Sequence, residues 1–250
     1  RLMPFTGAPL FHALQLLATG DSARFHMPGH KRRTGPEDSF MNSCVDSFTN
    51  PFAVDITEIE GFDNLHHPEG ILRDSMKWAA DVYGADQTYY MINGSTGGIL
   101  AAVCGSVPRG GRILVSRNCH KAVYHGIFLN QLKASYVYPQ EIDGLGIQGG
   151  ILPSDVDMML KRYMDTHGSA YRVPTYDGVV SDIKGIARWS TGRASADCGR
   201  GSRRTFPLWG NVPCVRLGPG ADVVIQSVHK TMPSLTQTAL LHIRNNRPDR

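Results

Sequence analysis

The chain has 250 residues, of which 41% are hydrophobic and 19% charged, and this composition suits a globular domain with a substantial core. No apolar run approaches the length of a membrane span, and the N-terminal residues lack the pattern of a signal peptide. The five cysteines are scattered, without a disulfide framework or zinc-ligand spacing. We therefore expect a cytoplasmic protein that has no metal site.

The first fifty residues differ in pattern from the rest. Pro9–Leu17 has the apolar spacing of a short amphipathic helix, and Ala23–Pro51 is rich in glycine, proline and histidine, which favours irregular structure. We divide the chain into an N-terminal arm, residues 1–50, and one larger domain, residues 51–250.

Helical and extended patterns alternate after the arm. We expect helices over the stretch that follows Gly94 and over Ile71–Tyr83, His120–Leu132, Pro153–Thr166 and Val180–Ala187. We expect strands over Thr88–Ile92, Arg112–Val115, Ala134–Tyr138, Asp222–Gln226 and Thr238–His242. Such alternation predicts an α/β fold with a mostly parallel sheet flanked by helices.

The strand around Val224 ends in residues that suit a reactive site, namely Ser227, His229 and Lys230. Open α/β sheets bind ligands at the carboxyl ends of their strands. A lysine placed there can form a Schiff base with an aldehyde cofactor, and pyridoxal phosphate (PLP) is the cofactor that this suggests. The alternative is a lysine that only solvates the strand end.

Two further strand ends carry similar chemistry. Gly94, Ser95 and Thr96 lead from a strand into a helix, where exposed N–H groups and two hydroxyls suit a phosphate dianion. Ordinary N-capping by Ser95 or Thr96 is the alternative there. The strand that begins at Arg112 is followed by His120, which is either a site imidazole or a hydrogen-bonded core histidine. Three such strand ends together favour a cofactor pocket.

Seven motifs together resemble the Orn/Lys/Arg decarboxylases, and they occur in the order of that family. They are F-H-M-P-G-H-K (25–31), D-I-T-E (55–58), D-N-L-H-H-P-E-G (63–70), N-G-S-T-G-G (93–98), R-N-C-H-K (117–121), P-T-Y-D-G (174–178) and G-A-D-V-V-I-Q-S-V-H-K (220–230). The resemblance implies a PLP enzyme of the aspartate-aminotransferase fold (fold type I). It also implies a homodimer or larger homo-oligomer that decarboxylates lysine, ornithine or arginine in polyamine biosynthesis, without nucleic-acid or membrane partners.

The resemblance also implies roles for individual residues. Lys230 would be the Schiff-base lysine, and His120 would stack on the pyridine ring. Five residues would surround the phosphate, from the helix start and from the other side: Gly94, Ser95, Thr96, Ser227 and His229. Six residues match motifs that we place near the substrate entrance: His26, His30, Asp55, Glu58, Asp63 and His66. The family has a further small domain, so we expect this chain to be a fragment that lacks it.

One family motif is missing. A D-E-A-H-G-A-H sequence should precede the lysine and supply the carboxylate that keeps the ring nitrogen protonated. In its place, Arg188–Gly218 has six arginines against one acid, a net charge of +5 in a chain whose total is +4. By spacing, the missing carboxylate should fall at Gly199, and we do not assign its role to Asp197.

A shifted reading frame explains this stretch. A coding sequence for Ala196–Arg216 exists that, moved forward by one base, translates as Q-I-A-D-E-A-H-G-A-H-F-P-C-G-E-T-F-P-V-S. The alternative is a genuine arginine-rich surface insertion that binds an acidic partner or nucleic acid. We expect the stretch from Arg188 to Gly218 to form a poorly packed surface loop, with a gap or strained edge in the sheet.

Two alternatives to an active decarboxylase remain. The chain is either another PLP enzyme of this fold, such as an aminotransferase or aldolase, or a catalytically dead remnant. The F-H-M-P-G-H-K and D-N-L-H-H-P motifs favour a decarboxylase over the first alternative. The missing carboxylate predicts little or no activity for the chain as written.

Overall fold

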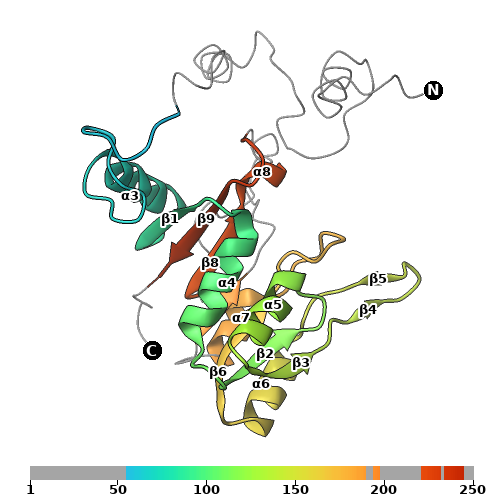
Figure 1. The fold of residues 1–250 in the computed structure, drawn as a ribbon. Coiled ribbons are helices and arrows are strands. Elements are labelled where there is room, and N and C mark those ends of the chain that lie inside the picture. Colours follow the sequence, from blue (N-terminus) through green and yellow to red (C-terminus); the bar gives the residue numbers. More distant parts are fainter. Residues whose placement is uncertain (1–54, 190–193, 198–220, 232–233, 245–250) are drawn as a thin grey trace, which may run out of the picture.

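The structure is a computed structural model that describes residues 55–189, 194–197, 221–231 and 234–244 (Figure 1). The N-terminal arm, with the expected helix Pro9–Leu17, lies outside the described residues. Most of the arginine-rich stretch Arg188–Gly218 (the basic stretch), namely residues 190–193 and 198–218, also lies outside the described residues.

A sheet of seven strands forms the centre of the described part, in the order β1-β9-β8-β7-β6-β2-β3. β9 is antiparallel to both of its neighbours, and the other adjacent pairs are parallel. The strands are β1 (Gln87–Met91), β2 (Arg112–Ser116), β3 (Lys133–Val137), β6 (Thr166–Tyr171), β7 (Ala194–Asp197), β8 (Val223–Ser227) and β9 (Ala239–Ile243).

Helices cover both faces of this sheet. They are α3 (Ile71–Tyr83), α4 (Gly94–Ser106), α5 (Lys121–Leu129), α6 (Pro153–Arg162), α7 (Ile183–Trp189) and the short α8 (Val228–Thr231). Figure 1 shows α3 beside β1 at one end of the sheet and the hairpin β4 (Glu141–Ile142) and β5 (Ile147–Gln148) projecting at the other. This arrangement confirms the expected α/β fold with a mostly parallel sheet.

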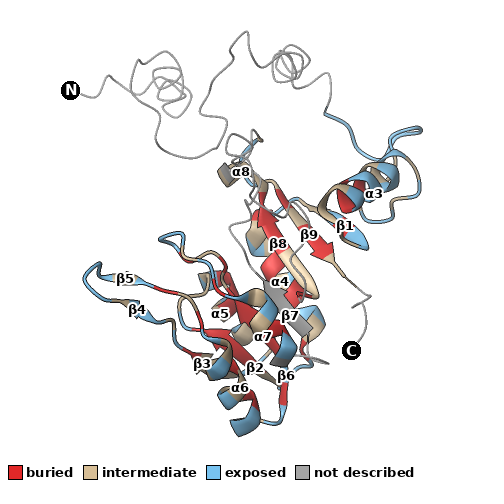
Figure 2. Ribbon diagram, turned by 180° about the vertical axis from the view of Figure 1, so that it is seen from behind, coloured by how far each residue is buried: buried red, intermediate tan, exposed pale blue. Residues whose placement is uncertain are grey.

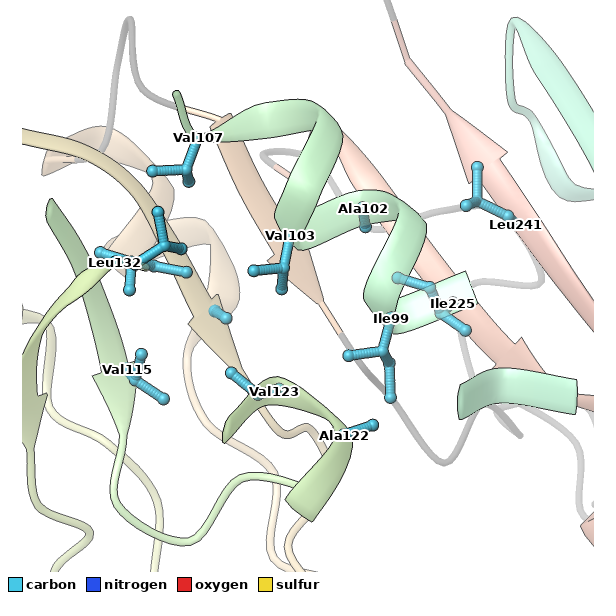
Figure 3. Close-up of a cluster of buried hydrophobic side chains, with 12 residues drawn as sticks. Ile99, Ala102, Val103, Val107, Val115, Ala122, Val123, Leu132, Ile225 and Leu241 are labelled. Atoms are coloured by element: carbon cyan, nitrogen blue, oxygen red, sulfur yellow. The ribbon is translucent and has the colours of Figure 1, made fainter. Parts of the chain in front are cut away.

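The core divides into two layers because successive strand residues point to opposite faces. Ile113 and Val115 of β2 pack with α4 and α5, whereas Leu114 packs with α6 and α7. Figure 3 shows the first layer, in which Val103 of α4 and Val123 of α5 meet over the sheet. Buried residues therefore follow the strands, as Figure 2 shows.

The sheet has no gap where we expected one. β7 lies between β6 and β8, pairing Gly168–Tyr171 with Ala194–Asp197 and Ala196–Asp197 with Val223–Val224. The expectation of a loop over the whole stretch is therefore wrong for the residues of β7, and also for Arg188 and Trp189, which end α7. Strand pairing uses backbone groups, so a short run without branched residues can still complete the ladder.

Most element boundaries differ from the sequence prediction by one to four residues, and the helix predicted over Val180–Ala187 is observed over Ile183–Trp189. The helix that begins at Pro153 ends at Arg162, and Thr166 already belongs to β6. β6 reads T-H-G-S-A-Y, which is poor in the branched residues that indicate a strand. His120 lies before α5 as its N-cap and not inside the helix.

A buried polar network joins β1, β8, β9 and α3 on the face opposite α4. His242 is 0% exposed, its Nδ1 accepts from the Thr88 hydroxyl (2.8 Å), and its Nε2 donates to Gln226 Oε1 (3.3 Å). Gln226 in turn donates to the Tyr83 hydroxyl (3.3 Å), and the Tyr83 and His242 rings lie 4.7 Å apart. Burial lowers the pKa of His242 to about 4. The ring is therefore neutral in the folded protein at neutral pH.

We predict that this network makes stability depend on pH. The pKa of His242 is lower in the folded chain than in the unfolded chain, so its contribution is complete above about pH 6.5 and is lost as the pH falls towards 4. The loss should be on the order of 3 kcal/mol. Urea unfolding between pH 7.5 and 4.5 should show a steeper fall for the parent than for His242→Gln, and parallel curves would contradict the assignment.

Candidate active site

The start of α4 is held in a conformation that only glycine adopts easily. Gly94 has a φ of +61°, and a Cβ at this position would lie 3.3 Å from the carbonyl oxygen of Gln237. The first helical hydrogen bond runs from Gly97 N–H to Asn93 O, and no described side chain caps the helix. Capping by Ser95 or Thr96, the alternative from the sequence, is therefore not seen, and the N–H groups of the first turn point out of the helix end.

A second glycine brings this helix end close to β8. A Cβ at Gly98 would lie 3.1 Å from Cγ2 of Ile225, which is tighter than ordinary contact, so the helix rests directly on the strand. Ser95 is half-buried and Thr96 exposed at the same end. The two hydroxyls and the free N–H groups thus lie at the carboxyl edge of the sheet, where β8 also ends.

The turn from β8 into α8 is hydrogen-bonded to Thr238, the residue before β9. The carbonyl oxygen of Thr238 accepts from Val228 N–H (3.1 Å), from His229 N–H (3.5 Å) and from His229 Nδ1 (3.0 Å). Because a carbonyl can only accept, Nδ1 of His229 carries a proton. Ser227 is 3% exposed, with its Oγ 3.4 Å from the same Nδ1. These contacts fix the backbone one residue before Lys230.

His120 lies at the same edge, as the residue before α5. Its Nδ1 accepts from Ala122 N–H (3.2 Å), which leaves the proton of the neutral ring on Nε2. Burial lowers the pKa of His120, and the positive charges of Lys230 and Arg172 lower it further. His120 is therefore a neutral ring within electrostatic reach of Lys230, so the structure brings these two sequence candidates together.

Sequence reasoning missed Arg172, which follows β6. Its backbone N–H donates to Ser116 Oγ (3.4 Å), and its guanidinium lies 5.6 Å from the centre of the Tyr176 ring. The only signal was its place directly after a strand, and β6 itself was not recognised.

Burial raises the pKa of the neighbouring Cys119 thiol to about 11, so this cysteine stays a thiol and is a poor nucleophile.

The expected entrance residues are placed differently. Asp63 accepts backbone N–H groups from Asn64, Glu69, Gly70 and Leu72, at 2.8 to 3.0 Å. These bonds, with that from Glu69 first, hold the pKa of Asp63 well below its usual range. The carboxylate therefore organises the loop before α3.

The rest of this loop lies apart from the carboxyl edge of the sheet within one chain. Asp55, Glu58 and His66 are exposed, and Figures 1 and 2 show residues 55–70 beside α3, away from the start of α4 and from α8. His26 and His30 lie outside the described residues. Of the expected entrance residues, the four that the structure describes therefore lie apart from Lys230 in a single chain.

The arginine-rich stretch Arg188–Gly218 contributes the strand β7 to the sheet. Asp197 is the last residue of β7, in register with Tyr171 of β6 and Val224 of β8. Its backbone thus ends at the carboxyl edge that also carries Ser227.

No group of three or more His, Cys, Asp and Glu side chains among the described residues could hold a metal ion. The helices in the described ranges are also too short or too polar to cross a membrane.

Solved structures define the class of this fold. The Francisella novicida lysine decarboxylase LdcF matches with a TM-score of 0.66 at 22% identity, over 96% of this chain and 36% of that one. The pyridoxal-5'-phosphate dependent protein YhfS of Escherichia coli matches with a TM-score of 0.55 at 14% identity, over 82% and 52%. The described sheet and its flanking helices therefore have the fold-type-I architecture.

The chain belongs to the Orn/Lys/Arg decarboxylase family, whose major-domain model matches residues 8–249. The uncharacterized protein YaaO of Bacillus subtilis is 32% identical over 241 residues, 95% of this chain and 49% of that protein. An arginine decarboxylase of Bacillus cereus is 32% identical over 239 residues, 94% of this chain and 51% of the relative. The chain thus spans about half the length of these relatives.

We predict that a methyl group at Gly94 damages the start of α4. Gly94→Ala should lower the free energy of unfolding by about 1–3 kcal/mol, because alanine at positive φ is strained and its Cβ crowds Gln237. Gly105→Ala in the same helix, where a Cβ meets nothing within 4 Å, should leave stability unchanged or raise it slightly. Chemical denaturation of both variants checks this, and equal effects would refute a special role for Gly94.

Proposed function

We propose that this chain binds PLP and that, in the full-length homo-oligomer, it decarboxylates a basic amino acid. One observation carries the proposal: a single edge of the sheet gathers an uncapped helix start, a buried serine, an anchored lysine turn and a neutral imidazole. That is the set of groups that a phosphorylated aldehyde cofactor requires.

The residues present fit the phosphate. Three N–H groups at the start of α4 precede the first helical hydrogen bond, and Ser95 and Thr96 add hydroxyl donors beside them. Ser227 offers a buried hydroxyl at the end of β8. The Nδ1 of His229 donates to Thr238, so its Nε2 would donate to a phosphate oxygen only as the doubly protonated imidazolium. Charge-assisted hydrogen bonds of this kind favour a dianion strongly.

Lys230 and His120 would act on the rest of the cofactor. Bound PLP supplies an electron sink for the pair left when the α-carboxylate departs. Lys230 would hold the aldehyde carbon through its Nζ and exchange it for the substrate amine. His120 would present the flat face of a neutral ring, with the Nε2 proton available to a substrate or cofactor oxygen.

The family and the names of its relatives support a basic substrate. Relatives include an arginine decarboxylase of Bacillus cereus and an inducible lysine decarboxylase of Escherichia coli, at 32% and 25% identity. We propose lysine, ornithine or arginine as substrate, with a diamine or agmatine as product. A homodimer would bring a second copy of the loop at Asp63 and His66 near the site, where one chain alone leaves it distant.

We expect turnover by the chain as written to be weak. The D-E-A-H-G-A-H motif is missing, and Asp197, the acid that ends β7, falls two residues before the position at which spacing places the motif's carboxylate. Losing several kcal/mol of transition-state stabilisation slows a reaction on the order of a thousandfold or more. Cofactor binding does not require that carboxylate, so binding and turnover are separate tests of the proposal.

Borohydride reduction tests the lysine assignment. The parent chain, incubated with PLP and reduced, should carry one phosphopyridoxyl group on Lys230, seen by peptide mass spectrometry. Lys230→Ala should lose this group, whereas Lys121→Ala, which removes a nearby cation at the first residue of α5, should keep it. Labelling of Lys230→Ala at the parent level would place the reactive lysine elsewhere.

Serine variants test the phosphate site. Ser95→Ala and Ser227→Ala should each weaken PLP binding by roughly 1–3 kcal/mol, the usual cost of a lost hydrogen bond to a charged group. Ser106→Ala, at the far end of α4, is the matched control and should bind PLP like the parent. Spectroscopic titration with PLP measures all three, and full affinity in both site variants would refute the phosphate site.

A further inference from the structure

An apolar groove lies on the face of the sheet opposite α4, between α3 and the carboxyl end of β1. Its volume is about 580 Å³, and its walls include Trp78 and Val82 of α3, Tyr90 and Ile92 at the end of β1, and Leu240 of β9. Trp78 is 69% exposed and Ile92 is 63% exposed. Large apolar side chains that gather in this way usually mark a surface that another segment covers.

Several residues that line the groove also adjoin the segments of the proposed phosphate site. Ile92 is two residues before Gly94, and Gln237, which lines the groove, has its carbonyl against Gly94. Val228, whose N–H bonds to Thr238, also lines it. An occupant of the groove would therefore press on the opposite side of the segments that form the proposed phosphate site.

The lining sets the chemistry of the occupant. None of the residues that line the groove is charged, and its polar members are the hydroxyl and amide groups of Ser234, Thr236, Gln237 and Thr238 and the Tyr83 and Tyr90 phenols. An occupant with charged groups would lose hydration without gaining partners. The groove thus fits an uncharged, largely aliphatic segment.

We propose that Pro9–Leu17 of this same chain fills the groove as a short amphipathic helix. Its sequence, P-L-F-H-A-L-Q-L-L, contains neither lysine, arginine, aspartate nor glutamate. Leu10, Leu14 and Leu17 fall on one helical face, with His12 and Gln15 on the other. This is the pattern by which an amphipathic helix lies in an apolar groove.

The chain has the length to make this contact. Residues 18–54 separate Leu17 from Asp55, and an extended chain spans up to about 3.3 Å per residue, which far exceeds the dimensions of the domain. Nine helical residues are about 13 Å long, and so short a helix is marginal alone in water. The segment therefore gains its helix by docking, and α3 gains a cover for Trp78.

Trp78 reports directly on this contact. The other two tryptophans, Trp189 and Trp209, are replaced by phenylalanine in the full chain, so that emission and acrylamide quenching come from Trp78 alone. Leu14→Asp, on the apolar face, should shift the emission to the red and raise the quenching constant about twofold, as the indole becomes exposed. Gln15→Asp, on the polar face, is the matched control and should leave both unchanged.

A second measurement distinguishes loss of this contact from misfolding of the Leu14→Asp variant. A synthetic peptide of residues 5–20, added to the Leu14→Asp variant, should restore the low quenching, and the same peptide with Leu14→Asp should not. Equal quenching in the parent and in Leu14→Asp would overturn the proposal. Quenching that rises on dilution together with dissociation of an oligomer would show that a second copy covers the groove, and this too would overturn it. These readouts need no cofactor, so their failure is distinct from failure of the proposed function.

Discussion

The candidate site depends on two successive backbone carbonyls, those of Gln237 and Thr238. The carbonyl of Gln237 lies against Gly94 and sets how closely α4 approaches, while the carbonyl of Thr238 accepts three N–H groups from the turn before Lys230. The two halves of the site are far apart in sequence, and both contact the two residues that precede β9. Because β9 is antiparallel, it starts at the edge where β8 ends.

This junction explains why the antiparallel strand matters to a site made by parallel ones. β8 and α4 alone would place Lys230 near the start of a helix, but the turn between β8 and Lys230 would be flexible. The Thr238 carbonyl removes that freedom, and the positive φ of Gly94 lets the helix begin without a clash. The apolar groove lies on the other side of the same segment, so a helix docked there would support the junction from behind.

The sequence predicted the parts of this arrangement that follow from local pattern. The apolar spacing of Ile71–Tyr83 predicted α3 with its observed bounds, because a helix that buries one face has a periodic pattern. The β-branched run at Val223 predicted β8, because a strand that is buried on both faces is apolar throughout. β6 and β7 were not predicted, since T-H-G-S-A-Y and A-S-A-D carry weak strand propensity and form through pairing with their neighbours. The site candidates at Lys230 and His120 came from strand ends, whereas Arg172 and the Gln237–Thr238 junction depend on tertiary contacts that no local pattern encodes.

Substitution of Gln237 tests the junction most directly. Its φ is +69°, a conformation that glycine adopts freely and a β-branched residue resists. PLP affinity and borohydride labelling of Lys230 are measured together in Gln237→Gly and Gln237→Val, with far-UV circular dichroism to confirm folding. The account predicts that the glycine variant keeps both properties and that the valine variant loses both in parallel. A folded valine variant that binds and labels like the parent would contradict it.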